Sequence, residues 1–168
     1  LNNREIIKKL KVSKFNKGFL GTSINSKSIK KNNLFIPIKG KKKDGHMFIQ
    51  EALKKKAAFS VSSNQNVKLI KGKIFSVKNT NTFLNSLAIE KRLSSNASII
   101  GVTGSSGKTS VKEILGKYLK LFGDTYYSPR SFNNHYGVPI SLCNLEKTHK
   151  FGIFEIGMSY PGEINKLS

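Results

Sequence analysis

Residues 98–122, SIIGVTGSSGKTSVKEILGKYLKLF, decide the fold. The stretch begins with an apolar, β-branched run at residues 99–103, which predicts a buried strand. A glycine-rich turn at residues 104–109 follows. Beyond it, apolar side chains recur at the spacing of one face of an α-helix that Gly123 ends: Val111, Ile114, Leu115, Tyr118, Leu119 and Phe122. A strand, a glycine turn with Gly-Lys-Thr and a helix, in this order, are typical of a phosphate-binding loop.

The turn contains the residues that such a loop needs. Its glycines allow successive backbone N–H groups to point at an anion, and the helix N-terminus adds partial positive charge. Lys108 is expected to reach the β- and γ-phosphates of a nucleotide, and the Thr109 hydroxyl to ligate Mg²⁺. Val102 stands where the strict motif has its first glycine, so a purely structural strand-to-helix turn is the alternative. The predicted cofactor-binding residues are Gly104, Ser105, Ser106, Gly107, Lys108, Thr109 and Ser110.

A carboxylate follows in a second predicted strand. Residues 151–156 form an apolar run with Glu155 near its C-terminal end, and ligands of parallel α/β sheets bind at that end of the strands. Glu155 is therefore predicted to hold Mg²⁺ together with Thr109, directly or through water. The alternative is an exposed glutamate that pairs with a lysine. Lys108, Thr109 and Glu155 are the predicted catalytic residues.

The patterns predict an α/β fold with two domains, at residues 1–97 and 98–168, separated by the polar break at residues 94–96. In the first domain we expect a short helix around Ile6, strands at residues 34–38, 57–61 and 74–77, and a helix from residue 79 or 80. Asp44 is expected to cap a further helix. In the second domain, after the loop helix, we expect a strand at 125–127, a helix at 138–145 and the strand at 151–156. We expect the chain to be a piece of a longer protein.

The strong positive charge is unevenly distributed. Residues 1–97 hold 22 Lys and Arg against 4 Asp and Glu, whereas residues 98–168 hold 8 against 5. Of the 30 basic residues 27 are Lys, although Arg is the usual reader of bases and bidentate partner of phosphates. This favours solvated lysine-rich surfaces and attraction of an anionic substrate over specific nucleic-acid binding, which stays the least favoured alternative.

The remaining composition suits a cytoplasmic protein. No apolar run approaches the ~18 residues of a membrane span, and no signal peptide is recognisable. The single cysteine, Cys143, excludes an intramolecular disulfide, and its apolar context predicts a buried, inert thiol. The three histidines, His46, His135 and His149, are expected at the surface or in turns rather than as ligands.

Several motifs together resemble the Mur ligase family of peptidoglycan synthesis. They are GSSGKTSVKE at 104–113, FNN at 132–134 with GVP at 137–139, and EIGM at 155–158 with PGEI at 161–164. NSK at 25–27, LFIPIKG at 34–40 and DGH at 44–46 are similar to N-terminal segments of the family. Asn25 and Lys27 stand in place of the family's Asp and Arg, and Ser159-Tyr160 in place of its Asn-His.

The resemblance implies an ATP- and Mg²⁺-dependent peptide ligase. The nearest branch of the family joins D-alanyl-D-alanine to a UDP-N-acetylmuramoyl tripeptide through an acyl phosphate. Residues 1–97 would then be a UDP-substrate domain, with Asn25, Ser26 and Lys27 as substrate contacts. Residues 98–168 would be the first part of the ATP-binding domain, with Asn133 and Asn134 on the substrate and phosphate side. A carbamylated lysine, a metal-site histidine and a further domain would lie beyond residue 168.

The resemblance also implies a state for the full-length enzyme, and two other functions remain open. The full-length enzyme is expected to be a cytoplasmic monomer with no nucleic acid partner and no membrane span, and the 168-residue chain alone to be inactive. Another amino-acid ligase of the same family remains open. So does a different P-loop enzyme, such as a small-molecule kinase, which would bind a nucleotide but be indifferent to UDP-sugars.

Overall fold

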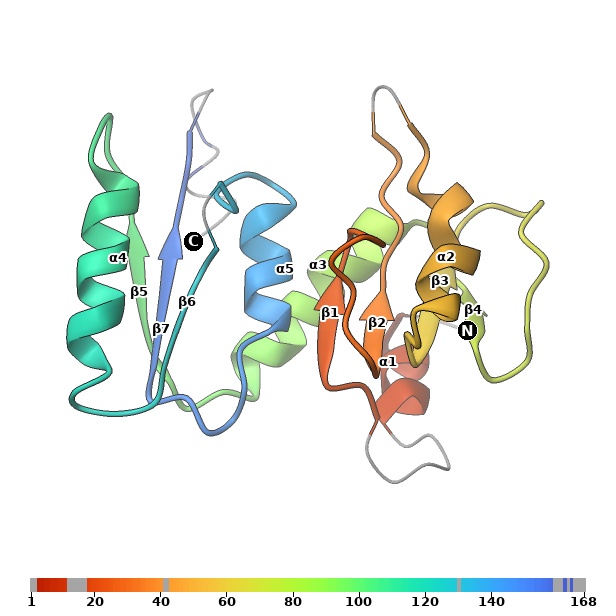
Figure 1. The fold of residues 1–168 in the computed structure, drawn as a ribbon, viewed down its shortest axis with the longest axis horizontal. Helices are drawn as coiled ribbons and strands as arrows, with labels where there is room; N and C mark the ends of the chain where they lie inside the picture. Colours follow the sequence, from red (N-terminus) through yellow and green to blue (C-terminus); the bar gives the residue numbers. More distant parts are fainter. Residues whose placement is uncertain are drawn as a thin grey trace. The chain divides into compact units, whose positions relative to one another are not determined.

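The computed structural model describes residues 3–11, 18–40, 43–129, 131–158, 162 and 164. The chain divides into two compact units, Leu1–Leu87 and Ala88–Ser168, and each is described by itself (Figure 1). Ser159, Tyr160, Pro161 and Glu163, which belong to the quoted motifs, lie outside the described residues. Both units pair α-helices with a parallel sheet, so the predicted α/β fold class is confirmed.

The first unit contains a four-stranded parallel sheet in the order β1-β2-β3-β4. Its elements are α1 Asn3–Lys11, β1 Gly21–Ser23, β2 Asn33–Phe35, η1 Gly45–Phe48, α2 Ile49–Lys54, β3 Phe59–Ser62, β4 Ile74–Ser76 and the start of α3 Thr80–Leu93. All were predicted within a few residues except β1. That strand is only three residues long and reads Gly-Thr-Ser, so no apolar alternation marks it.

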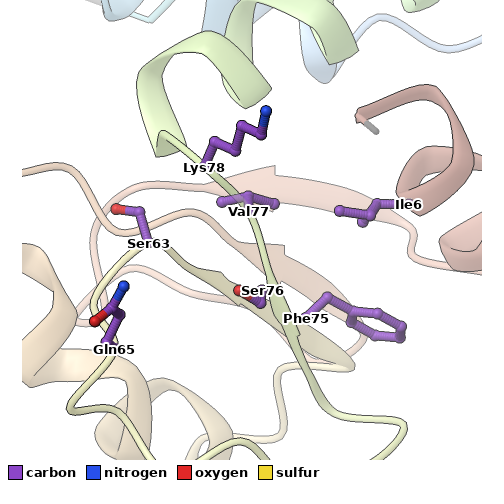
Figure 2. A pocket seen from close by; sticks show the side chains of 7 residues that line it. All are labelled: Ile6, Ser63, Gln65, Phe75, Ser76, Val77 and Lys78. Atoms are coloured by element: carbon purple, nitrogen blue, oxygen red, sulfur yellow. The ribbon is translucent and has the colours of Figure 1, made fainter. Parts of the chain in front are cut away.

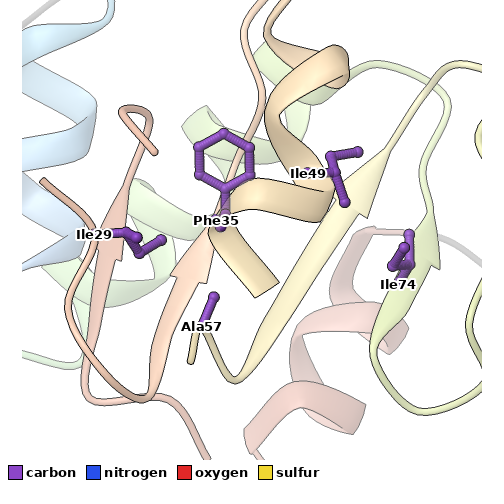
Figure 3. Packing of buried hydrophobic residues seen from close by; sticks show 6 residues of the cluster. Ile29, Phe35, Ile49, Ala57 and Ile74 are labelled. Carbon is purple, nitrogen blue, oxygen red and sulfur yellow. The ribbon is translucent and has the colours of Figure 1, made fainter. Parts of the chain in front are cut away.

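A hydrophobic core fills the space between α2 and this sheet. The cluster consists of Ile29, Phe35, Ile49, Ala52, Ala57 and Ile74, and Figure 3 shows the side chains of Phe35 and Ile49 near one another between strand and helix. Ile6 and Ile7 of α1 are also fully buried. At roughly 25 cal/mol per Å² of apolar surface, burial of each large side chain contributes about 1.5–3 kcal/mol to the fold.

The segment after β2 is irregular, and it leads to two polar residues, Asp44 and His46. β2 ends at Phe35, before Pro37, which has no N–H for a sheet ladder. β2 lies between β1 and β3, so an irregular position for Pro37 is confirmed and an edge position is wrong. Asp44 caps the next element as predicted, because its side chain accepts a hydrogen bond from the backbone N–H of His46, although that element is a 3₁₀ turn that leads into α2.

The second unit is a three-stranded parallel sheet in the order β5-β7-β6. After the end of α3 its elements are β5 Ser98–Val102, α4 Lys108–Leu119, β6 Thr125–Tyr127, α5 Gly137–Cys143 and β7 Phe151–Glu155. Figure 1 shows α4 on one side of these strands and α5 on the other. The register aligns Val102 with Glu155, so the phosphate loop leaves β5 beside the carboxylate that ends β7.

Two expectations about burial in this unit are wrong. The β5 strand is present, but Ile99 and Ile100 are only half-buried because β5 is the edge strand of the described sheet. The apolar face predicted for α4 is not the face that it buries: Ile114 and Tyr118 are 66% and 59% exposed. The helix packs through the opposite side, where Gly116 lies so close to the Tyr127 ring that a Cβ there would come within 2.5 Å of it.

Two simpler expectations agree with the structure. Cys143 is buried on α5, and burial raises the pKa of its thiol far above the ordinary value, so an inert thiol is confirmed. Among the described helices, none is both long and apolar enough to cross a lipid bilayer.

Candidate phosphate and magnesium site

The loop between β5 and α4 has the backbone that an anion-binding turn requires. Gly104 and Gly107 have φ values of 147° and 74°, which glycine adopts without strain. Gly107 is the N-cap of α4, so the helix begins at Lys108 and its first N–H groups face the loop. Ser105, Ser106 and Ser110 lie exposed along this turn. The loop therefore presents N–H donors and a helix N-terminus to solvent.

Lys108 lies over its own loop. Its Nζ donates hydrogen bonds to the carbonyl oxygens of Gly104, at 2.6 Å, and Ser105, at 3.4 Å. Both contacts are exposed, and a phosphate group would offer the ammonium a charged acceptor. The side chain is thus already located where the sequence places it, at the mouth of the turn.

Glu155, at the end of β7, and Thr109, in the first turn of α4, are hydrogen-bonded to each other. The Thr109 hydroxyl donates to Glu155 Oε2 at 2.9 Å, and Asn133 Nδ2 donates to Glu155 Oε1 at 2.8 Å. Glu155 is only 2% exposed, so the alternative of an exposed, surface-paired glutamate is wrong. Segments 46 residues apart in sequence therefore bring a hydroxyl and a carboxylate to one point beside the phosphate loop.

The donor set fits Mg²⁺ bound together with a nucleotide. Mg²⁺ prefers oxygen ligands and is usually held by one or two carboxylates plus substrate phosphates. Thr109 and Glu155 supply two such oxygens, and Thr109 can offer a lone pair to the ion while its hydroxyl hydrogen stays hydrogen-bonded to Glu155. Among the described residues no three His, Cys, Asp or Glu side chains gather into a self-sufficient metal site, so phosphate oxygens would have to complete the coordination.

The two predicted asparagines differ in what they contact. Asn133 reaches Glu155, and its carbonyl accepts from the N–H of Gly157 at 2.7 Å. Asn134 instead turns back on the chain, where its Oδ1 accepts from the N–H groups of Tyr136 and Gly137 at the start of α5. Asn133 thus belongs to the carboxylate cluster, whereas Asn134 shapes the entry to α5.

Lys112 is the site residue that sequence reasoning missed. It lies one helical turn beyond Lys108, and its side chain is fully buried. Its Nζ donates to the Ser128 carbonyl at 2.6 Å and lies 3.8 Å from Glu155 Oε2. The signal was present in the sequence as a lysine at the helical spacing i, i+4 from Lys108, but surface lysines at that spacing are common.

The predicted substrate residues of the first unit lie in the turn after β1. Ser26 is buried, and its hydroxyl donates to Glu51 Oε2 at 3.0 Å. Hydrogen bonds from Lys55, first, and from Ser26 hold the pKa of Glu51 below its ordinary value. Asn25 and Lys27 are exposed, and Asn25 Oδ1 accepts from the Lys27 N–H within the turn. The turn therefore exposes the Asn25 amide and the Lys27 ammonium to solvent, while Ser26 between them is held by Glu51.

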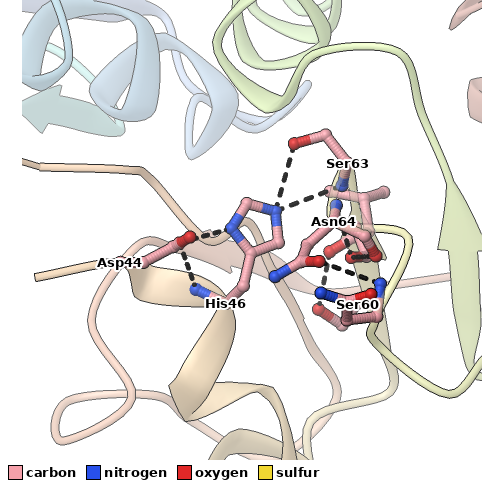
Figure 4. Close-up of polar contacts among 8 residues, drawn as sticks. Asp44, His46, Ser60, Ser63 and Asn64 are labelled. Atoms are coloured by element: carbon pink, nitrogen blue, oxygen red, sulfur yellow. Dashed lines mark hydrogen bonds and ion pairs between the residues drawn. The ribbon is translucent and has the colours of Figure 1, made fainter.

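His46 bridges Asp44 and Ser63 just after the end of β3, and these three residues are called the polar clamp (Figure 4). His46 Nδ1 lies 2.5 Å from Asp44 Oδ1, and its Nε2 accepts from the N–H of Ser63, just after β3, at 3.1 Å. His46 is buried and lies in a turn, which agrees with the expectation of a surface or turn position. The clamp ties the 3₁₀ turn to the end of β3.

The clamp predicts a pH-dependent contribution to stability. The backbone N–H of His46, followed by its ring, lowers the pKa of Asp44 from 3.8. A lowered folded-state pKa gives stability that is present above pH 3.8 and is lost as the pH falls through the folded pKa. Asp44→Asn should therefore destabilise the chain in urea unfolding at pH 7, and the difference from wild type should shrink below pH 3.8. A difference independent of pH would contradict this assignment.

A hollow of about 540 Å³ adjoins the clamp at the ends of β3 and β4. It is lined by Ile6, Ser63, Gln65, Phe75, Ser76, Val77 and Lys78. Figure 2 shows Ile6 and Phe75 at one end and Ser63 and Gln65 at the other, so the hollow has an apolar and a polar side. None of the predicted substrate residues lines it.

Comparison with known proteins identifies the family. The Mur ligase family, catalytic domain, matches residues 19–92, and the Mur ligase middle domain matches residues 102–168. Together these matches cover both units. The chain belongs to the Mur ligase family.

Two relatives of the chain carry the same name. The chain is 43% identical over 141 residues to the UDP-N-acetylmuramoyl-tripeptide–D-alanyl-D-alanine ligase of Buchnera aphidicola. This match covers 84% of this chain and 30% of the relative. It is 41% identical over 143 residues to the ligase of the same name from Rickettsia prowazekii, covering 85% and 32%. The chain thus spans about a third of the length of these relatives.

Solved structures agree with this. A MurF ligase from Thermotoga maritima in complex with ADP superposes with a TM-score of 0.70 at 35% identity, covering 88% of this chain and 35% of that one. The D-alanyl-D-alanyl ligase structure from Acinetobacter baumannii gives a TM-score of 0.72 at 27% identity, covering 89% and 33%.

Proposed function

We propose that this chain forms the substrate-binding and phosphate-binding part of a ligase that adds D-alanyl-D-alanine to a UDP-N-acetylmuramoyl tripeptide, using ATP and Mg²⁺. The observation that carries the proposal is the Thr109–Glu155 hydrogen bond beside the Gly104–Lys108 loop, in a chain whose relatives bear that name. We assign residues 1–97 to the UDP-substrate domain and 98–168 to the first part of the ATP-binding domain.

The chemistry explains why these residues are needed. A carboxylate is a poor acyl donor because its leaving group would be oxide. ATP supplies a phosphoryl group that converts the tripeptide carboxylate into an acyl phosphate, and the amine of D-alanyl-D-alanine then displaces phosphate. The protein contributes alignment and neutralisation of charge. Lys108 and the loop N–H groups would hold the phosphates, while Thr109 and Glu155 would hold Mg²⁺.

The assignment of partners follows from the same reasoning. Asn25, Ser26 and Lys27 would contact the UDP portion, with the net positive charge of residues 1–97 attracting the anionic substrate. Asn133 would orient Glu155 on the phosphate side, and Asn134 would act through the segment before α5. A nucleotide-linked substrate and a single buried thiol agree with a cytoplasmic enzyme, which we propose to be monomeric at full length.

Binding to the 168-residue chain tests the proposal against a different P-loop enzyme. We expect calorimetry to detect saturable binding of ADP with Mg²⁺ and of UDP-N-acetylmuramoyl tripeptide, but not of an unrelated nucleotide-sugar such as GDP-mannose. Lys27→Gln should weaken only the UDP ligand. Nucleotide binding that is accompanied by no affinity for the UDP-muramyl peptide would favour a small-molecule kinase and overturn the proposal.

Glu155→Gln should raise the Mg²⁺ requirement. The change keeps the shape of the side chain but removes the charge that would face the ion. We expect the Mg²⁺ concentration that half-saturates ADP binding to rise about tenfold or more. Glu146→Gln, at an exposed position, is the matched control and should leave it unchanged. An unaltered Mg²⁺ dependence of Glu155→Gln would mean that the ion is held elsewhere.

A further inference from the structure

Lys112 and Glu155 form a buried charge pair at the base of the site. Among the described residues they are the only Lys, Arg, Asp or Glu side chains that are buried, at 0% and 2% exposed. Burying an unpaired charge costs several kcal/mol, so such a pair persists only where partners compensate both members. Lys112 Nζ also lies 3.3 Å from Glu113 Oε1, on the same helix.

The pair is closed into a ring by Ser128. Lys112 Nζ donates to the Ser128 carbonyl at 2.6 Å, and the backbone N–H of Glu155 donates to Ser128 Oγ at 3.2 Å. Lys112 Nζ then faces Glu155 Oε2 at 3.8 Å, which is ion-pair distance but too long for a hydrogen bond. The ring therefore joins α4, the segment after β6 and the end of β7 through three buried residues.

The ring fixes the spacing of the two candidate Mg²⁺ ligands. Thr109 and Lys112 lie three residues apart on α4, so they face the same side of the helix. Glu155 Oε2 is the atom that both approach, Thr109 by a hydrogen bond and Lys112 by charge. Movement of α4 relative to β7 would change the Thr109–Glu155 distance, and the ring links these two elements directly beside the two ligands.

We propose that Lys112, acting through the Lys112–Ser128–Glu155 ring, is the positioning residue that holds Glu155 in register with Thr109 for Mg²⁺. The inference rests on the proposed function, because it concerns the same site. Lys112 itself touches neither nucleotide nor ion. Groups that orient a metal ligand in this way typically change metal affinity about 10–100-fold when they are removed.

The sign of the effect separates positioning from simple charge. Removal of a positive charge near an Mg²⁺ ligand would, by electrostatics alone, strengthen binding of the cation. Loss of positioning would weaken it. We therefore expect Lys112→Met to raise the half-saturating Mg²⁺ concentration for ADP binding about 10–100-fold. ADP binding in EDTA should change less than about twofold, because the loop N–H groups and Lys108 remain.

The matched variants complete the test. Lys117→Met, at an exposed position of the same helix, should behave as wild type. Ser128→Ala is a smaller break that keeps the Ser128 carbonyl and removes only the acceptor of the Glu155 N–H. It should raise the Mg²⁺ requirement in the same direction, and it keeps the test decisive should Lys112→Met fail to fold. A lowered or unchanged Mg²⁺ requirement in Ser128→Ala, or in folded Lys112→Met, would overturn the proposal.

A double-mutant cycle in the ligand-free chain provides a readout that needs no nucleotide. Lys112→Met and Glu155→Gln each disrupt the same pair, so the double variant should be less destabilised in urea unfolding than the sum of the single ones. Additive effects would show that the two side chains do not act as a unit. If wild type bound no ADP at all, the proposed function would fail, while this cycle would still decide whether the ring exists.

Discussion

Replacement of Lys108 with alanine should abolish turnover of the complete ligase while leaving the fold unchanged. The ammonium is the positive charge at the mouth of the phosphate loop, and loss of such a group typically lowers kcat about 10³-fold. Its two hydrogen bonds in the structure go to exposed carbonyl oxygens of its own loop, so its removal leaves no buried group without a partner. Steady-state phosphate release, with thermal unfolding as the check on folding, measures both parts.

The control for this prediction lies on the same helix. Lys117 is exposed and remote in sequence from the loop, so Lys117→Ala should retain normal rates. Near-normal rates in Lys108→Ala would sink the assignment of the phosphate loop. A large loss of thermal stability in that variant would instead mean that Lys108 holds the loop together.

The second large effect concerns the 168-residue chain alone, which should form no peptide bond. It contains Lys108, Thr109 and Glu155, so it should bind ADP with Mg²⁺. It corresponds to about a third of the length of its relatives, so we expect it to hold only part of the groups that align the two reactants. Positioning two reactants for attack is worth about 7–11 kcal/mol, and without it turnover falls below detection.

Mass spectrometry after incubation with ATP, Mg²⁺, UDP-muramyl tripeptide and D-alanyl-D-alanine tests this. The Buchnera relative, assayed in parallel, is the positive control. Any UDP-muramyl pentapeptide formed by the 168-residue chain would show the expectation to be wrong. The same preparation should tend to aggregate through the exposed apolar side of α4, through the turn after it, where Leu121 and Phe122 are 77% and 58% exposed, and through β5. Residues 1–97 should be the better-ordered part.

The sequence predicted elements whose signals are local. A β-branched run followed by a glycine turn and a periodic helix identified β5, the loop and α4, and the carboxylate at the end of β7 followed from the rule that ligands meet strand ends. Those signals involve neighbours along the chain. β1 was missed because three residues, Gly-Thr-Ser, carry no periodicity.

The sequence did not predict which side chains are buried where burial depends on contacts between distant segments. An apolar stripe on α4 predicts a buried face, yet the described part of the chain packs the helix through Lys112 and Gly116. Nothing in a sequence distinguishes a buried lysine from the many exposed ones beside it; its burial follows only once Ser128 and Glu155, 16 and 43 positions away, are brought to it. The burial of His46 depends on a tertiary contact in the same way, since its partner Ser63 follows a different strand.

The way in which Lys108 folds back on Gly104 and Ser105 has a consequence for ligand discrimination. A ligand that draws the ammonium onto itself replaces two hydrogen bonds that Lys108 makes within its loop. A single small anion offers only one set of acceptors, and it competes with carbonyls held in place by the chain. A polyphosphate offers acceptors to the ammonium and to the loop N–H groups at once. The contacts of Lys108 within its own loop would therefore favour a polyphosphate over a small single anion.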